Sequence, residues 1–97
     1  MERNYINGKW VSPRLGPTFD SISPANQAEI LGTLPRSNAE DVDDAVQAAR
    51  AAYPAWRKLS RIKRGEYLDN FCQLVKADAE DIARLMAKEC GKSINEC

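Results

Sequence analysis

The stretch that decides the fold is residues 37–53, with the sequence SNAEDVDDAVQAARAAY. Its start reads as a capping box, in which the Ser37 hydroxyl and the Glu40 carboxylate each satisfy a free backbone amide. Apolar residues then recur every three or four positions, as on one face of a helix: Val42, Ala45, Val46, Ala49 and Tyr53. Since Pro54 has no backbone N–H, we expect this helix to stop or kink near Tyr53, and the next residues to form a turn that seats Trp56 in the core.

Upstream of this helix, the sequence predicts short strands and turns. Asn7 and Gly8 favour the left-handed angles of a tight hairpin turn between strands at 5–6 and 10–11. Residues 12–17 hold two prolines and a glycine, which indicates a loop. Residues 18–23 and 29–34 predict a second strand pair, joined by a turn at 24–27 and ended by Pro35. These patterns are typical of two hairpins or a small meander.

Downstream, two more helical patterns follow. Ser60 suits the N-cap of a helix whose buried stripe consists of Leu68, Phe71, Cys72 and Val75. A restart near Asp78 precedes a second stripe made of Ile82, Leu85 and Met86, and Gly91 suits the C-terminal cap. Residues 93–96 read as a second capping box, which indicates the start of a truncated helix.

The predicted fold class is therefore α+β, with short N-terminal β-hairpins followed by two or three helices. We expect one segment over residues 1–97. Within it, we assign 1–36 to strands and turns, 37–59 to the first helix and a turn, 60–91 to the second helical stretch and 92–97 to the start of a truncated helix. Because that last cap has no helix behind it, either the tail is disordered or the chain is the beginning of a longer one, and we favour the second reading.

Composition excludes several classes of protein. The 97 residues carry 14 basic and 14 acidic side chains, so no net field attracts nucleic acid or anionic lipid. The N-terminus has no long apolar run, and no stretch reaches the length of a membrane span, so we expect neither a signal peptide nor a membrane partner. The three cysteines are odd in number, and no pair has the spacing of a zinc knuckle or redox motif, so they do not indicate a disulfide framework. The lack of such a framework favours a cytoplasmic location.

Few residues suggest chemistry. The chain has no histidine to serve as a base or metal ligand, and we expect Cys72 to be a buried, inert thiol and Cys97 an exposed one. Cys90 falls at a helix C-terminus, where the dipole disfavours a thiolate. Gly91 and Lys92 do not complete a phosphate loop, because Met86 stands where that motif needs glycine.

Two other groups of side chains have an alternative reading. The basic cluster between residues 57 and 64 is either a solvated face, which we favour, or an anion site. The aromatic residues do not interleave with basic ones as a base-stacking platform would, so we expect them in the core: Trp10, Tyr53, Trp56, Tyr67 and Phe71.

Read in order, these elements resemble the N-terminal segment of the NAD(P)-dependent aldehyde dehydrogenase superfamily. The resemblance runs from about residue 4 to the last residue. Its motifs are N-Y-I-N-G-K-W-V at 4–11, S-P-A-N at 23–26, I-L-G at 30–32, E-D-V-D at 40–43, A-V-Q-A-A at 45–49, A-W-R at 55–57, R-G-E at 64–66 and E-C-G-K at 89–92.

The resemblance implies that the segment is part of the α/β Rossmann-like cofactor-binding domain of that fold. A full-length member oxidises an aldehyde to a carboxylic acid with NAD or NADP through a cysteine nucleophile. Semialdehyde-oxidising variants look most similar. None of the family's catalytic or cofactor motifs occurs here, so we expect no catalytic, cofactor-binding or metal-binding residue in this chain and no bound cofactor.

The resemblance implies a structural role for the segment. Its partners would be the rest of its own chain and, at full length, further copies in a homo-oligomer. The isolated segment is expected to be inactive and marginally stable. Two alternatives remain at this point, namely a standalone helical interaction module without catalytic activity and a small anion- or nucleic-acid-binding domain.

Overall fold

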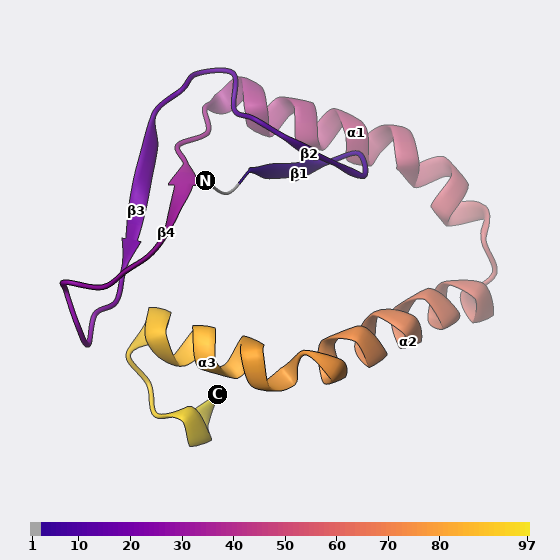
Figure 1. The fold of residues 1–97 in the computed structure, drawn as a ribbon. Coiled ribbons are helices and arrows are strands. Elements are labelled where there is room, and N and C mark those ends of the chain that lie inside the picture. Colours follow the sequence, from indigo (N-terminus) through magenta and orange to yellow (C-terminus); the bar gives the residue numbers. More distant parts are fainter. Residues whose placement is uncertain (1–2) are drawn as a thin grey trace.

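The computed structural model describes residues 3–97 and contains two β-hairpins followed by three α-helices and a short 3-10 helix (Figure 1). The predicted α+β composition is confirmed. The elements are β1 (Asn4–Ile6), β2 (Lys9–Val11), β3 (Thr18–Ile22), β4 (Ile30–Pro35), α1 (Ala39–Lys58), α2 (Arg61–Ala77), α3 (Ala79–Cys90) and η1 (Ile94–Glu96).

The strands form two separate antiparallel hairpins, so the meander is wrong. Asn7 and Gly8 turn β1 into β2 with φ angles of 53° and 75°, as the Asn-Gly pair predicts. The rings of Tyr5 and Trp10, directly opposite each other across this hairpin, lie 5.0 Å apart. In the second hairpin β4 ends at Pro35, as the sequence predicts, and Pro35 itself is the last residue of the strand, opposite Thr18.

Helix α1 begins one residue later than the sequence predicts. Its N-cap is Asn38, whose side chain accepts a hydrogen bond from the backbone N–H of Asp41 at 3.0 Å. Asp41 completes the capping box by accepting from the backbone N–H of Asn38, also at 3.0 Å. The expected box from Ser37 to Glu40 is wrong because the Ser37 hydroxyl is engaged elsewhere, by the amide of Asn4 at 2.7 Å.

The expected stop near Tyr53 is also wrong. Pro54 lies inside α1, and Trp56 belongs to the helix, not to a turn. Pro54 removes one backbone donor, but the neighbouring residues 51, 52 and 55 are alanines, which have the strongest helix propensity. The helix ends at Lys58, and the N–H of its C-cap residue Leu59 donates to the Trp56 carbonyl.

The remaining helix boundaries agree closely with the predicted ones. The Ser60 hydroxyl accepts a hydrogen bond from the N–H of Lys63 and caps α2. Asp78 separates α2 from α3, and Gly91 ends α3 with a left-handed φ of 68°. The second capping box does not form: Ser93 makes no side-chain cap bond, and only the 3-10 helix η1 follows it.

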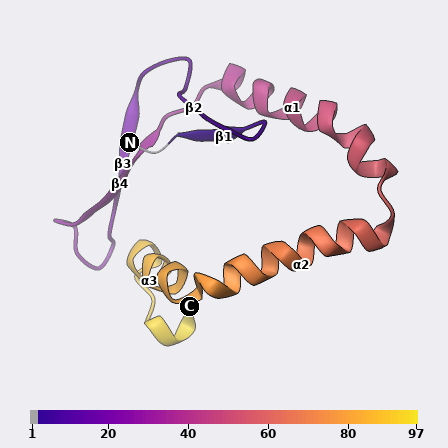
Figure 2. The same ribbon diagram turned by 45° about the vertical axis from the view of Figure 1, so that its right-hand side comes forward.

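The described helices and hairpins are spread out and make few contacts with one another. Both ribbon views show α1 on one side and α2 with α3 on the other (Figures 1 and 2). The radius of gyration is 17.1 Å, against about 12.5 Å for a compact chain of this length. The accessible surface is 7961 Å², about 2,400 Å² more than a compact protein of this mass exposes.

The prediction of a buried core is therefore wrong for this chain. Among residues 3–97 no apolar side chain is fully buried, and Trp56 and Phe71 are 40% and 63% exposed. Cys72 is exposed as well. The stripes have the predicted spacing, but the described part of the chain provides no surface to cover them.

One contact joins the β3–β4 hairpin to the end of α3. The Lys88 ammonium donates to the Glu29 carboxylate at 2.7 Å, across 59 residues of sequence. A Cβ atom added to Gly91 would lie 3.2 Å from Cγ of Pro24, so the backbone of the helix end lies against the hairpin tip. Beside Pro24, Ser23 is only 3% exposed. We call this contact, made by Pro24, Glu29, Lys88 and Gly91, the clasp.

Candidate functional site

Among the described residues, none of the three thiols has a base among its hydrogen-bond partners. Cys72 and Cys90 are exposed on α2 and at the end of α3. Cys97 is half-buried, contrary to the exposed terminal thiol that the sequence predicts, and its S–H donates to the Ser93 carbonyl at 3.4 Å. Residues 3–97 contain no cluster of three or more potential metal ligands.

The basic cluster near residues 57–64 lies at the junction between α1 and α2. Arg64 extends back from α2 and donates to the carbonyls of Arg57 and Leu59 at 3.2 and 3.1 Å, which satisfies free acceptors at the end of α1. Lys63 pairs with Glu66 at 3.0 Å. The rings of Trp56 and Tyr67 lie 5.8 Å apart across the same junction. Two of the cations are thus used within the fold, which supports the reading as a structural, solvated face.

The N-terminus of α1 forms a polar cluster with the loop between β2 and β3. Asp41, only 6% exposed, accepts the backbone N–H groups of Asn38 and Arg14, both at 3.0 Å. These two bonds hold the pKa of the Asp41 carboxyl below its ordinary value. The Arg14 guanidinium donates to both carboxylate oxygens of Asp44, at 2.8 to 3.0 Å.

This cluster binds the loop between β2 and β3 to the helix. No local sequence pattern indicates the role of Arg14, because its partners Asp41 and Asp44 lie 27 and 30 residues away. The acidic residues of the first turn predict only a favourable interaction with the helix dipole. The carboxylates of Asp41 and Asp44 are thus both paired within the fold.

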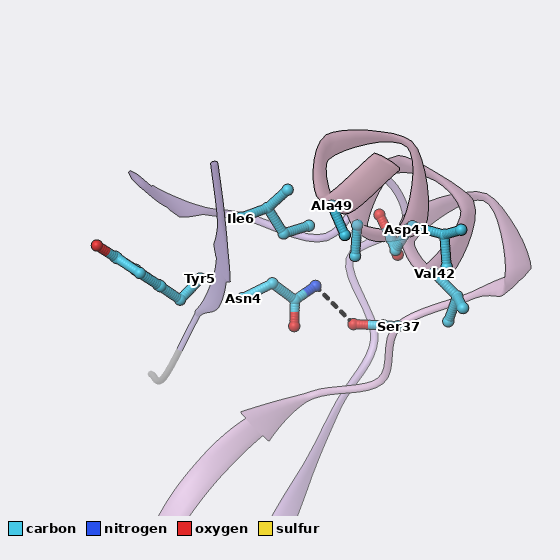
Figure 3. A pocket seen from close by; sticks show the side chains of 9 residues that line it. Asn4, Tyr5, Ile6, Ser37, Asp41, Val42 and Ala49 are labelled. Carbon is cyan, nitrogen blue, oxygen red and sulfur yellow. Dashed lines mark hydrogen bonds between the residues drawn. The ribbon is translucent and has the colours of Figure 1, made fainter. Parts of the chain in front are cut away.

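Next to this cluster, an open groove of about 410 Å³ runs between β1 and α1. Figure 3 shows Ile6 and Asn4 extending from the same side of β1 toward the helix, with Tyr5 on the other side. The hydrogen bond between Asn4 and Ser37 closes one end (Figure 3). The apolar lining is contributed by Ile6, Val42, Ala45, Val46 and Ala49. We call this cavity the β1–α1 groove.

The aldehyde dehydrogenase family model matches residues 10–97, and the chain belongs to that family. A malonate-semialdehyde dehydrogenase from Lacticaseibacillus casei is 38% identical over 94 residues, covering 97% of this chain and 19% of that protein.

Solved structures agree with this assignment. A crystal structure of an NADP-dependent enzyme from E. coli superposes with a TM-score of 0.93 at 37% identity, over 98% of this chain and 20% of that one. A betaine aldehyde dehydrogenase from Staphylococcus aureus in complex with NAD+ gives a TM-score of 0.91 at 33% identity, over 98% and 20%. The chain therefore spans about a fifth of the length of the proteins that it matches. No helix of residues 3–97 is long and apolar enough to cross a membrane.

Proposed function

We propose that residues 1–97 are a structural segment of an NAD(P)-dependent aldehyde dehydrogenase that oxidises an aldehyde to a carboxylic acid. The observation that carries this proposal is the family match over residues 10–97, together with the close superposition on enzymes of known structure. We treat residues 1–97 as one unit within a larger cofactor-binding domain. The proposed organisation follows the sequence assignment: strands and turns at 1–36, the first helix and a turn at 37–59, the second helical stretch at 60–91 and the start of a truncated helix at 92–97.

We further propose that the segment carries no catalytic, cofactor-binding or metal-binding residue. The side chains support this reading, because the described thiols have no base among their hydrogen-bond partners. The described residues do not fit a nicotinamide dinucleotide either. The glycines, at 8, 16, 32, 65 and 91, do not have the spacing of a phosphate-binding turn, and the N-terminus of α1 is closed by the capping box of Asn38 and Asp41. When bound elsewhere in the enzyme, the cofactor would accept the hydride.

For the substrate we propose an aldehyde that carries a second, acidic group. The support is the malonate-semialdehyde dehydrogenase from L. casei, which is 38% identical to this chain. We also propose that the full-length enzyme is a cytoplasmic homo-oligomer. Three free thiols without a disulfide are compatible with a reducing compartment.

The experiment expresses the complete reading frame that contains these residues and measures NADH or NADPH formation. Malonate semialdehyde, betaine aldehyde and a simple aliphatic aldehyde are compared with each cofactor. We expect reduction with at least one cofactor, and the highest kcat/KM with the semialdehyde. No reduction with any pair, from folded protein, would overturn the activity, whereas a preference for betaine aldehyde would overturn the substrate class. Light scattering tests the oligomer, and a monomer would contradict it.

A further inference from the structure

The turn between β1 and β2 places a side-chain amide beside an unhindered backbone amide. Its two residues, Asn7 and Gly8, are exposed and have positive φ angles, as in a type I′ turn. Apart from its chain neighbours, no described atom lies within 4 Å of a Cβ atom added to Gly8. The backbone nitrogen of Gly8 is therefore open to approach, since glycine has no side chain to shield it.

Asn7 differs from the other asparagines in its neighbour and in its hydrogen bonding. Of the six asparagines in the sequence, Asn7 alone precedes a glycine. Asn4 donates to a serine hydroxyl, and the side chains of Asn26 and Asn38 accept backbone N–H groups. Among residues 3–97, neither the Asn7 side chain nor the Gly8 N–H has a hydrogen-bond partner. Nothing described holds these two amides apart.

The hairpin that carries this turn is small enough to open. Strands β1 and β2 have three residues each, and within the described chain they form a sheet of two strands. An isolated two-stranded hairpin is marginally stable in water. Local opening lets the backbone at Asn7 rotate until the Gly8 nitrogen reaches the Asn7 side chain.

We propose that Asn7 is a site of spontaneous deamidation, in which the backbone nitrogen of Gly8 displaces the side-chain nitrogen of Asn7. Gly8 N, which gives its proton to water, forms a bond to Cγ of Asn7, and the bond from Cγ to the side-chain nitrogen breaks, releasing ammonia. Water then opens the resulting succinimide at either carbonyl, and Gly8 N regains a proton. The product is aspartate or isoaspartate, and no oxidant or reductant takes part.

The two products affect the hairpin differently. Aspartate followed by glycine still suits the turn, although it adds a negative charge. Isoaspartate leads the backbone through Cβ and Cγ, which adds one atom to a two-residue loop. The longer loop no longer fits the pairing of Ile6 with Lys9. Because β1 lies beside α1 and Asn4 bonds to Ser37, isoaspartate at position 7 loosens the contact between strand and helix (Figure 1).

The test ages the full-length enzyme in neutral buffer and follows each asparagine by mass spectrometry of its peptides. Conversion adds one mass unit, and electron-transfer fragmentation separates isoaspartate from aspartate. Asn26 is the internal reference, because it is also exposed but precedes Gln27. Asn7→Gly is the matched control, since two glycines suit the same turn and leave no amide to convert.

We expect Asn7 to convert at least about tenfold faster than Asn26, and Gly8→Ala to slow the conversion at least about tenfold, because a Cβ atom hinders the attack. Equal rates at Asn7 and Asn26 would overturn the proposal, and so would a rate that Gly8→Ala leaves unchanged.

Hydrogen exchange tests the structural consequence. We expect the amides of residues 4–11 to lose protection in aged wild-type enzyme and to keep it in aged Asn7→Gly. Equal protection in the two aged proteins would overturn the loosening of β1. Deamidation consumes only water, so an inactive enzyme would refute the proposed function and leave this inference standing.

Discussion

Replacing Gly91 by alanine tests the clasp between α3 and the β3–β4 hairpin. Gly91 has a φ of 68°, and a left-handed angle costs an alanine about 1–2 kcal/mol. The new Cβ would lie 3.2 Å from Cγ of Pro24, inside the optimal separation of about 3.5–4.0 Å. Displacing a packed neighbour costs about 1 kcal/mol more. We therefore expect Gly91→Ala to destabilise the protein by about 2–3 kcal/mol.

Gly8 provides the matched control, because its φ is 75° and no atom lies within 4 Å of an added Cβ. Gly8→Ala should show the backbone cost alone, about 1–2 kcal/mol. The assay is the thermal midpoint of the full-length enzyme, measured for Gly8→Ala, Gly91→Ala and the double variant Pro24→Ala/Gly91→Ala. We expect the double variant to recover the part of the Gly91→Ala destabilisation that exceeds the loss measured for Gly8→Ala. Equal losses in the two glycine variants, with no recovery, would show that Pro24 does not contact the helix end.

Further predictions concern the caps and the ion pair. Asn38→Ala should cost about 1 kcal/mol, measured by thermal unfolding, and Asn38→Asp should retain most of that stability. Pro54→Ala should raise the thermal midpoint, because it restores an N–H donor inside α1; an unchanged or lower midpoint would contradict this. Because its N–H partners lower the pKa of Asp41, its contribution is complete above its ordinary value of 3.8 and is lost as pH falls through the lower folded-state pKa. Asp41→Asn should therefore flatten the acid branch of a stability-versus-pH curve. Lys88→Met should cost less than about 1 kcal/mol, and any cost should shrink in high salt, since both partners are solvent-accessible.

The sequence predicts the elements well where the signal is local. The Asn7-Gly8 turn, the Ser60 cap and the Gly91 cap each depend on a few neighbouring residues, and all three are confirmed. The cap of α1 is wrong by one residue because two adjacent polar side chains compete for it. The hydroxyl of Ser37 is taken by an amide 33 residues away, which no local pattern indicates.

Burial is where the prediction fails. The periodic stripe identifies which residues share a face of α2, but it cannot say what lies opposite that face. Phe71 and Cys72 have core-type spacing and are nevertheless exposed. The same limit applies to Arg14, whose contacts depend on a loop returning to a helix 27 residues later. The helix does not stop before Pro54, because the alanines around it favour the helix.

The clasp also has a kinetic consequence. Closing a loop of the 59 residues between Glu29 and Lys88 costs roughly 3–4 kcal/mol of chain entropy, which one exposed ion pair does not offset. The hairpins and helices form from neighbouring residues on a microsecond scale, whereas the two halves of the segment lack enough mutual contacts to find their orientation alone. Their relative placement should therefore be acquired late in folding, when the surfaces that α1 and α2 leave exposed are covered.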